Sequence, residues 1–351
     1  MRLTAGLAIS LDAMGGDKAP DMVVHGADIA RQRFPQVRFQ FYGDTDRLKP
    51  IFKGLPALAA VSDIHHADTV ITMDDKPGQA LRAGRGSSMR LAIDAVQRGE
   101  SNAVVSAGNT GALMAMAKFV LKTMPGIDRP AIASFFPTMR SESVMLDLGA
   151  NVVCDASNLV QFAVMGNVFA RTVLGVREPS TALLNVGSEE MKGHDAVKEA
   201  AAILRLVNLP GRFHGFVEGD DIAKGTVDVI VTDGFTGNVA LKSIEGTVKL
   251  YGYFLRQSFG SSLMAKFGYL LARPALNALR ARVDPRRYNG AIFMGLNGIC
   301  VKSHGGTDAF GFANAIGVAV DMVQNGAIEN MKRDFDQMIT TPGAAPGSAA
   351  L

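Results

Sequence analysis

Tryptophan is absent from this chain of 351 residues, and cysteine occurs only as Cys154 and Cys300. The two cysteines are far apart and neither belongs to a C-x-x-C pair, so we expect neither a disulfide framework nor a zinc site. Cys154 has no neighbouring base that would activate a thiol, which favours an inert buried residue over a nucleophile. This sparse use of cysteine is typical of the reducing cytosol, and we expect a cytoplasmic protein.

Long apolar runs and a strong charge of either sign are also missing. No uncharged apolar stretch approaches the roughly 20 residues that span a bilayer, and Asp12 interrupts the short apolar stretch near the N-terminus, which makes a poor signal peptide. The formal net charge is +3, too small for the whole molecule to act as a polyanion binder, so no nucleic-acid partner is expected. The histidines show no spacing of the H-E-x-x-H kind, and no metal site is predicted. We therefore expect a soluble protein that at most lies on a membrane surface.

Glycine is abundant, at 38 residues, and short runs rich in valine, isoleucine and alanine end in glycine or a small polar residue. Continuous apolar runs of this length are typical of strands buried in a parallel sheet. The runs are LAISLDAMGG, VRFQFYGD, NAVVSAGNTGA, AIASFFP, SVMLDLGAN, TALLNVGS, FHGFVEGDD, VDVIVTDGFTGN, AIFMGLNG and GICVKSHGG.

Helical patterns lie between these runs. Ser87 and Ser88 can cap a helix whose apolar positions continue to Val96, and similar patterns follow GNTG, GFTGN and HGGTDA. This alternation predicts a three-layer α/β/α sandwich with a largely parallel sheet. We expect one α/β domain over residues 1–339, followed by a disordered tail over 340–351 that is rich in small residues, proline and glycine.

Two strand-to-helix turns are candidate anion sites. Ligands of open parallel sheets bind beyond the carboxyl ends of the strands, and helix N-termini there offer free N–H groups and a positive dipole end. Ordinary helix capping would explain a single turn of this kind. Two such turns in one chain favour a binding site for phosphate or a phosphorylated ligand. Neither turn matches the P-loop or the full G-x-G-x-x-G pattern. The turns contain Ser106, Gly108, Asn109 and Thr110, and Asp233, Thr236, Gly237 and Asn238.

The first turn of the chain combines Gly15 and Gly16 with two acids, Asp12 and Asp17. The glycines would let the backbone approach an anion closely, whereas the two carboxylates would repel one. We therefore interpret the acids as acceptors that fix backbone N–H groups or Lys192.

Two further residues stand in strand-end turns. Lys192, in NVGSEEMKGHD, can reach an anion site as a point charge. A lysine that is merely solvated in a surface loop explains the residue equally well. His304, in KSHGGTDA, is the best functional candidate among the histidines.

A basic amphipathic helical segment is predicted at about residues 251–287. Residues 261–290 contain six basic residues and a single acid, Asp284, and their apolar residues recur at helical spacing. This pattern is typical of a helix that binds a membrane surface or an acidic protein partner. A helical hairpin at a subunit interface is equally favoured, because an apolar stripe must be covered. The candidate contact residues are Leu263, Lys266, Phe267, Leu271, Arg273 and Arg280.

Six motifs in this order resemble the bacterial phosphate acyltransferases, which transfer acyl groups from acyl carrier protein to phosphate in phospholipid synthesis. They are LDAMGGDKAP, SAGNTGALMA, MLDLGANV, LLNVGSEEMKG, DVIVTDGFTGNVALK and VKSHGGTDAF, and they extend from residue 9 to about 310. The resemblance implies a fold similar to the isocitrate/isopropylmalate dehydrogenase and phosphotransacetylase group, and usually a homodimer. It also implies a long-chain acyl substrate and an acyl phosphate product for a membrane enzyme. Phosphorolysis of a thioester needs little side-chain chemistry, so we expect no cofactor.

Lys192 and Asn238 match positions that this family uses in its active site. The chain departs from the family pattern at Val153, where an acid is common, and slightly in EGDDIAKG, which weakens any role for residues 153 and 218–221. We expect loop N–H groups at the Asn109 and Thr236 turns to hold phosphate, Lys192 to pair with phosphate or the oxyanion, and Asn238 to donate to the thioester carbonyl. The candidate substrate-binding residues are Asp12, Gly15, Gly16, Asp17, Ser106, Gly108, Asn109, Thr110, Asp233, Thr236, Gly237 and His304.

Three other functions remain open at this point. A short-chain phosphotransacylase acting on acyl-CoA would share the chemistry and differ in its acyl pocket. A decarboxylating dehydrogenase of the same fold group would need an acidic metal site and several arginines, neither of which the sequence supplies. A non-catalytic scaffold that binds acyl chains at the membrane would form no acyl phosphate.

Overall fold

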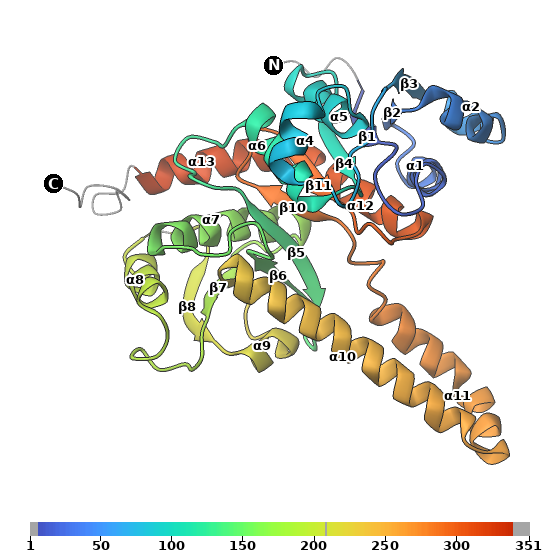
Figure 1. Ribbon diagram of the computed structural model, residues 1–351. Coiled ribbons are helices and arrows are strands. Elements are labelled where there is room, and N and C mark those ends of the chain that lie inside the picture. The colour runs from blue at the N-terminus through green and yellow to red at the C-terminus, as the bar shows by residue number, and fades with distance from the viewer. Residues whose placement is uncertain (1–5, 208, 340–351) are drawn as a thin grey trace.

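A computed structural model describes residues 6–207 and 209–339 of the protein (Figure 1). Eleven strands form one sheet in the order β3-β2-β1-β4-β11-β10-β5-β6-β9-β7-β8. Seven of its strand pairings are parallel, and the three antiparallel ones are β11–β10, β10–β5 and β5–β6. The sheet is therefore mostly parallel, as the continuous apolar runs predict.

The sheet consists of two parallel halves joined at its centre. One half contains β1 (Ala8–Asp12), β2 (Arg38–Gly43), β3 (Ser62–His66), β4 (Ala103–Ser106) and β11 (Ile299–Lys302). The other contains β6 (Glu142–Leu146), β7 (Ser180–Leu184), β8 (Arg212–Val217) and β9 (Val229–Val231). The joining strands are β5 (Ala131–Pro137) and β10 (Ala291–Met294).

Helices cover both faces of the sheet, and each face has its own apolar cluster. The first face is covered by α1 (Asp21–Arg33), α2 (Thr45–Lys53), α3 (Pro56–Ala59), α7 (Ala156–Val173), α8 (Asp195–Leu204), α12 (Ala309–Gln324) and α13 (Ala327–Ile339). The second is covered by α4 (Pro77–Ala83), α5 (Ser88–Gln97), α6 (Thr110–Leu121), α9 (Gly219–Lys224) and the start of α10 (Gly234–Gly260). This arrangement confirms the three-layer sandwich.

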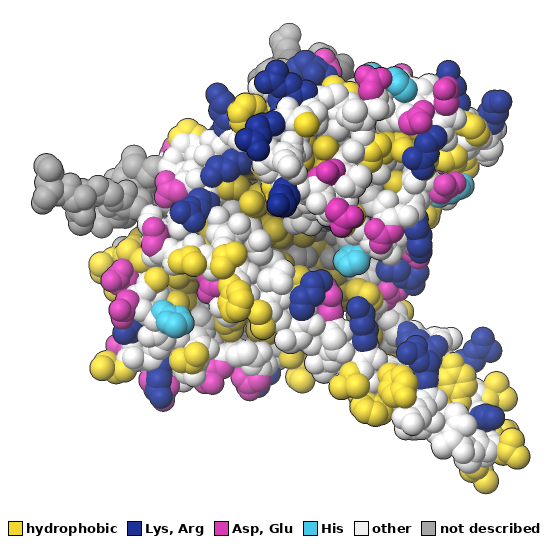
Figure 2. All heavy atoms as spheres, viewed as in Figure 1, with side chains coloured by type: hydrophobic (Ala, Val, Ile, Leu, Met, Phe, Trp, Pro, Cys, Tyr) yellow, Lys and Arg dark blue, Asp and Glu magenta, His cyan; other side chains and the backbone are white. Residues whose placement is uncertain are grey.

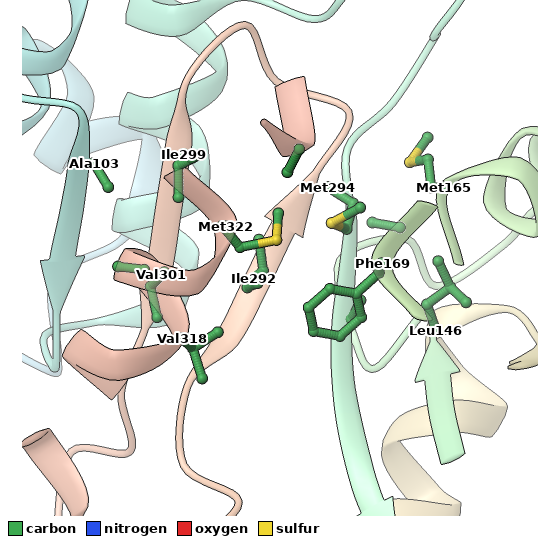
Figure 3. Close-up of a cluster of buried hydrophobic side chains, with 14 of the residues drawn as sticks. Ala103, Leu146, Met165, Phe169, Ile292, Met294, Ile299, Val301, Val318 and Met322 are labelled. Carbon is green, nitrogen blue, oxygen red and sulfur yellow. The ribbon is translucent and has the colours of Figure 1, made fainter. Parts of the chain in front are cut away.

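The apolar cluster of the first face continues across the junction between the halves. Figure 3 shows Val318 and Met322 of α12 beside Ile292 of β10, and Phe169 of α7 beside Leu146 of β6. All of these side chains are buried. The two halves therefore share one core on this face, which fixes their relative position.

All ten predicted strands are present, and β3 is the strand that the sequence analysis missed. Its sequence, SDIHH, is polar because β3 lies at the edge of the sheet, where it pairs only with β2. The helix predicted after Ser87 is α5, and the Ser87 side chain accepts a hydrogen bond from the Arg90 N–H. The tail predicted at 340–351 lies outside the described residues.

The predicted amphipathic segment forms a helical hairpin of α10 and α11 (Leu263–Arg282), which projects from the body of the molecule (Figure 1). None of the described residues of α11 is buried. The start of α10, by contrast, packs on the sheet through Ala240, Leu241 and Ile244. One long helix thus connects the body of the protein to an exposed arm.

Candidate active site

Three parallel strands end in a row of polar residues. Ser106 of β4 pairs in register with Lys302 of β11, and Asp12 follows Leu11, which pairs with Val105. Residues in register on neighbouring strands point to the same face of the sheet, here the face that α5, α6 and the start of α10 cover. Asp12, Ser106 and Lys302 are all buried.

Asp12 connects this row to the first turn of α5. Its two carboxylate oxygens accept hydrogen bonds of 2.6 Å from the hydroxyls of Ser88 and Ser106. Burial raises the pKa of the Asp12 carboxyl, and the hydrogen bonds from Ser106 and Ser88 act in the opposite direction. The buried carboxyl therefore fixes the ends of β1 and β4 against α5, because losing it would leave two buried hydroxyls without an acceptor.

The glycines after β1 allow the neighbouring turns to meet. A Cβ on Gly15 would lie 2.4 Å from Asp12 Oδ2 and 2.7 Å from the Gly108 nitrogen, so no side chain fits there. Gly16 has a φ of +108°, which favours glycine. The Asp17 N–H donates to the Gly305 carbonyl at 3.0 Å. The turns after β1, β4 and β11 therefore pack directly on one another.

His304 faces the other half of the molecule. Its Nδ1 accepts from the Gly306 N–H at 3.0 Å, which leaves Nε2 free to carry the proton of the neutral ring. Burial and the ammonium groups of Lys302 and Lys242 lower the pKa of His304, while Glu245 and Asp17 act in the opposite direction. Since Lys242 and Glu245 belong to α10, this helix and the β11 turn border the same cleft. Figure 2 shows the surface hollowed between the two halves.

Asn238 lies one helical turn before Lys242 on α10, against the turn after β6. Its Nδ2 donates to the Leu148 carbonyl at 3.2 Å. A Cβ on Gly149, whose φ is +131°, would lie 3.1 Å from that Nδ2. Glycine at this position therefore leaves room for the Asn238 amide.

Asp147 organises the turn on which Asn238 rests. Its side chain accepts hydrogen bonds from the N–H groups of Ile132, Ala150 and Asn151 at 2.9, 3.0 and 2.7 Å. The Asn151 carbonyl in turn accepts from the Gly234 N–H at 2.7 Å, at the start of α10. Burial raises the pKa of Asp147, and its hydrogen bonds oppose this shift.

Both predicted anion turns use their side chains as helix caps. Asp233 accepts from the Thr236 N–H at 2.9 Å and from its hydroxyl at 2.8 Å, so a carboxylate already occupies this part of the α10 N-terminus. Asn109 Oδ1 accepts from the Ala112 N–H at 3.0 Å. A phosphate role for these turns stays a prediction that depends on their other N–H groups. Thr110 and Gly237 begin the same helices.

The structure does not bring Lys192 into contact with the other candidates. Lys192 is exposed in the connection between β7 and α8, where its carbonyl accepts from the Asn185 Nδ2 at 3.1 Å. In the described part of the chain its ammonium forms no ion pair, and no hydrogen bond joins it to Asn238 or to the β1, β4 and β11 turns. Its role therefore remains a prediction.

The cysteines are poorly suited to covalent chemistry. Burial, together with the charge of Asp147, raises the pKa of Cys154 to about 12, and burial raises the pKa of Cys300. A thiol with a raised pKa is a weak nucleophile at neutral pH.

Lys302, Asp147 and Lys242 are site residues that the sequence analysis missed. Lys302 carried a visible signal, because a charged residue ends the buried run GICVK. Its burial became apparent only from the pairing of β11 with β4. Lys242 and Asp147 gave no comparable signal, since single charged residues near helices and turns are common.

The hairpin presents basic and apolar side chains (Figure 2). Leu263, Phe267 and Leu271 are 85%, 59% and 69% exposed. The basic residues Lys266, Arg273 and Arg280 lie on the same helix. Within residues 6–207 and 209–339, no helix is both long and apolar enough to cross a bilayer.

The sequence matches the Fatty acid synthesis protein family over residues 7–330. It is 67% identical over 330 residues to the phosphate acyltransferase of Rhodospirillum centenum, covering 94% of this chain and 93% of that protein. It is 58% identical over 349 residues to the phosphate acyltransferase of Rhodospirillum rubrum, covering 99% of this chain and 100% of that protein.

Solved structures share the fold at low sequence identity. A phosphotransacetylase from Streptococcus pyogenes aligns with a TM-score of 0.60 and 17% identity, covering 92% of this chain and 95% of that one. A 4-hydroxythreonine-4-phosphate dehydrogenase from Klebsiella pneumoniae aligns with a TM-score of 0.53 and 16% identity, covering 92% and 99% of the two chains. These similarities confirm the fold class.

Replacing Asp12 by alanine should lower the free energy of unfolding by about 2–4 kcal/mol, because the Ser88 and Ser106 hydroxyls lose their buried acceptor. Asp12→Asn retains one oxygen acceptor and should lose less. Urea denaturation measures both, with the exposed Asp17→Asn as a control that stays close to wild type. An Asp12→Ala variant as stable as wild type would show that this carboxyl does not hold the strand ends together.

Proposed function

Since this chain belongs to the phosphate acyltransferases of the Fatty acid synthesis protein family, we propose that it transfers a long-chain acyl group from acyl carrier protein to inorganic phosphate. We place the reaction in the cleft between α10 and the turns after β1, β4 and β11. The observation that carries this placement is that the charges of Lys242 and Glu245 on α10 act on the pKa of His304 in the opposite half. Groups from both halves of the sheet therefore meet in one cleft. The decarboxylating dehydrogenase and the non-catalytic scaffold are set aside, because the relatives are phosphate acyltransferases.

The chemistry of this transfer requires positioning more than side-chain catalysis. A phosphate oxygen attacks the thioester carbonyl carbon, and the carbonyl oxygen becomes an oxyanion. The intermediate collapses as the carbon–sulfur bond breaks, and the departing thiolate takes up a proton. Holding phosphate beside the carbonyl and stabilising the oxyanion are the two tasks left to the protein.

Asn238 is the proposed oxyanion donor. A side-chain amide has two N–H bonds, and one of these donates to the Leu148 carbonyl. That bond fixes the orientation of the amide, so the second N–H is available to the thioester oxygen. Preorganised donors of this kind act without reorganisation during the reaction.

Lys192 is the cationic residue that we propose the second half of the sheet contributes to the reaction. It is exposed and unpaired among the described residues, so its ammonium is available to phosphate or to the oxyanion. Asp12 and Asp17 are proposed as acceptors rather than phosphate ligands. Asp12 accepts hydrogen bonds from the Ser88 and Ser106 hydroxyls.

The hairpin is the proposed contact with the acidic carrier protein and the membrane surface. Exposed apolar residues on α11 provide area to bury, and Lys266, Arg273 and Arg280 provide positive charge for an acidic partner or anionic headgroups. We therefore propose a peripheral protein at the cytoplasmic face of the membrane. A homodimer is proposed as the oligomeric state.

The direct test is incubation with palmitoyl-acyl carrier protein and inorganic phosphate. We expect acyl phosphate, trapped as a hydroxamate, and free carrier thiol in equal amounts. A parallel reaction with acetyl-CoA identifies the short-chain alternative. Turnover of acetyl-CoA with none of palmitoyl-acyl carrier protein would contradict the proposed substrate, and no acyl phosphate from either would contradict the reaction.

Lys192→Ala and Asn238→Ala should each reduce turnover by about 10²–10³-fold, which is the usual cost of removing one preorganised donor. Thermal unfolding should remain close to that of the wild type, because neither side chain is in the core. Lys198→Ala, whose ammonium is paired with Asp195 on α8, is the matched control and should keep full turnover. Near-normal turnover of either variant would remove that residue from the mechanism.

A variant in which serine replaces Leu263, Phe267 and Leu271 together should not bind vesicles that contain an anionic phospholipid, because the apolar contact area is lost. Transfer to phosphate in solution should persist. The control carries serine at Met139 and Leu206, which are exposed outside the hairpin. Sedimentation measures vesicle binding and light scattering measures the oligomeric state. If the variant still binds vesicles but becomes monomeric, these apolar residues of α11 belong to the subunit interface instead.

A further inference from the structure

Lys302 is a buried cation with unused hydrogen-bonding capacity. The residue ends β11 and is 9% exposed. An ammonium group has three N–H donors, and here one donates to the carbonyl of the next residue, Ser303. In the described part of the chain Nζ makes no other hydrogen bond and no ion pair. Burying a charge in this way is costly unless a partner compensates it.

The position of Lys302 places this cation at the reaction cleft. Cys300, two residues earlier on the same strand, belongs to the apolar cluster under α5, α6 and the start of α10. Side chains two residues apart on a strand point to one face, so Lys302 points to the face that carries the cleft. Its neighbour in register is Ser106, whose hydroxyl is already directed to Asp12.

The charged groups around Lys302 do not neutralise it by contact. Asp12 from β1 and Asp17 from the following turn act on its charge, and the Cys300 thiol lies on its own strand. On the other side, Lys302 acts on His304, which Lys242 and Glu245 of α10 also face. Neither carboxylate forms an ion pair with Nζ, and both Asp12 oxygens accept hydrogen bonds from serine hydroxyls instead. The free donors therefore favour an added anion.

The surrounding turns favour a small anion. The turns after β1 and β4 pack closely, since a Cβ on Gly15 would lie 2.7 Å from the Gly108 nitrogen and one on Gly108 would lie 2.6 Å from the Met89 side chain, so these turns leave little room for a large ligand. Inorganic phosphate is the anion that the reaction consumes. Its charge is present before the attack, whereas the carbonyl gains charge only during the attack. A buried cation with free N–H donors can therefore bind the phosphate before the reaction begins.

We propose that Lys302 binds the inorganic phosphate substrate, with its ammonium directed at the phosphate oxygens from the floor of the cleft. This inference rests on the proposed function, because it takes phosphate as the nucleophile. Lys302 orients the phosphate and offsets its charge. It forms no covalent bond and transfers no proton in the attack. Its role is distinct from those given to Lys192 and Asn238.

The test compares Lys302→Met, which keeps the length and removes the charge, with Lys302→Arg, which keeps the charge. For Lys302→Met we expect the KM for phosphate to rise about tenfold or more, the usual effect of losing a charged hydrogen bond. The KM for palmitoyl-acyl carrier protein should stay unchanged. Inorganic phosphate alone should raise the Tm of wild type and not that of Lys302→Met. Lys118→Met, on the exposed side of α6, is the control and should behave as wild type.

The pH profile gives a second readout that a purely structural role would not change. Burial lowers the pKa of Lys302 to about 8, against the opposing effects of Asp12 and Asp17. The ammonium is charged below this pH and neutral above it. The kcat/KM of wild type for phosphate should therefore fall above about pH 8. In Lys302→Arg this fall should move to higher pH, since the guanidinium stays charged.

Three results would overturn the proposal. One is an unchanged KM for phosphate in folded Lys302→Met. Another is a lower kcat with an unchanged phosphate-induced shift in Tm, which would assign Lys302 to the oxyanion or to positioning. If Lys302→Met fails to fold, Lys302→Arg decides alone, and an alkaline limb identical to wild type overturns the proposal. Absence of acyl phosphate with wild type would refute the proposed function instead, while the phosphate-induced shift in Tm would still test Lys302.

Discussion

The carboxyl of Asp12, with the Ser88 and Ser106 hydroxyls donating to it, is the constraint on which the site depends. It joins the ends of two strands to the first turn of α5 inside the protein, where no water can replace a lost partner. The pairing of β4 with β11 then places Lys302 beside this group. Three segments that are far apart in the sequence thereby present one buried polar row to the cleft.

The second half of the sheet uses a similar arrangement. Asp147, directly after β6, accepts hydrogen bonds from the N–H groups of Ala150 and Asn151 in its own turn. Asp12, at the end of β1, accepts one from the N–H of Met14. The Asp147 turn supports Asn238 and the start of α10. Helix α10 then extends past the His304 turn and into the exposed hairpin. Helix α10 therefore links Asn238, proposed for the reaction, to the hairpin whose second helix, α11, carries the residues proposed for the carrier protein and the membrane.

The sequence predicts the sheet well where strands are buried and apolar. It fails for β3, because an edge strand with one paired side needs no apolar run. The turns that form the cleft are visible as glycine-rich strand ends, but the partners of their side chains are not. Only the structure shows that the Asn109 side chain caps the Ala112 N–H and that the Asp233 side chain caps the Thr236 N–H. Lys302 is visible as the charged end of an apolar run, but its burial could not be predicted, since it depends on a pairing between strands about 200 residues apart.

The central claim is that phosphate attacks the thioester directly and that no acyl group is carried by the protein. Both cysteine thiols have a raised pKa, which is consistent with that claim. The most direct measurement mixes the enzyme with palmitoyl-acyl carrier protein labelled in the acyl chain, first without phosphate and then with it. The account predicts no label on the protein and no released thiol until phosphate is added. A burst of thiol equal to the enzyme concentration before phosphate is added, with label on Cys154 or another residue, would contradict it.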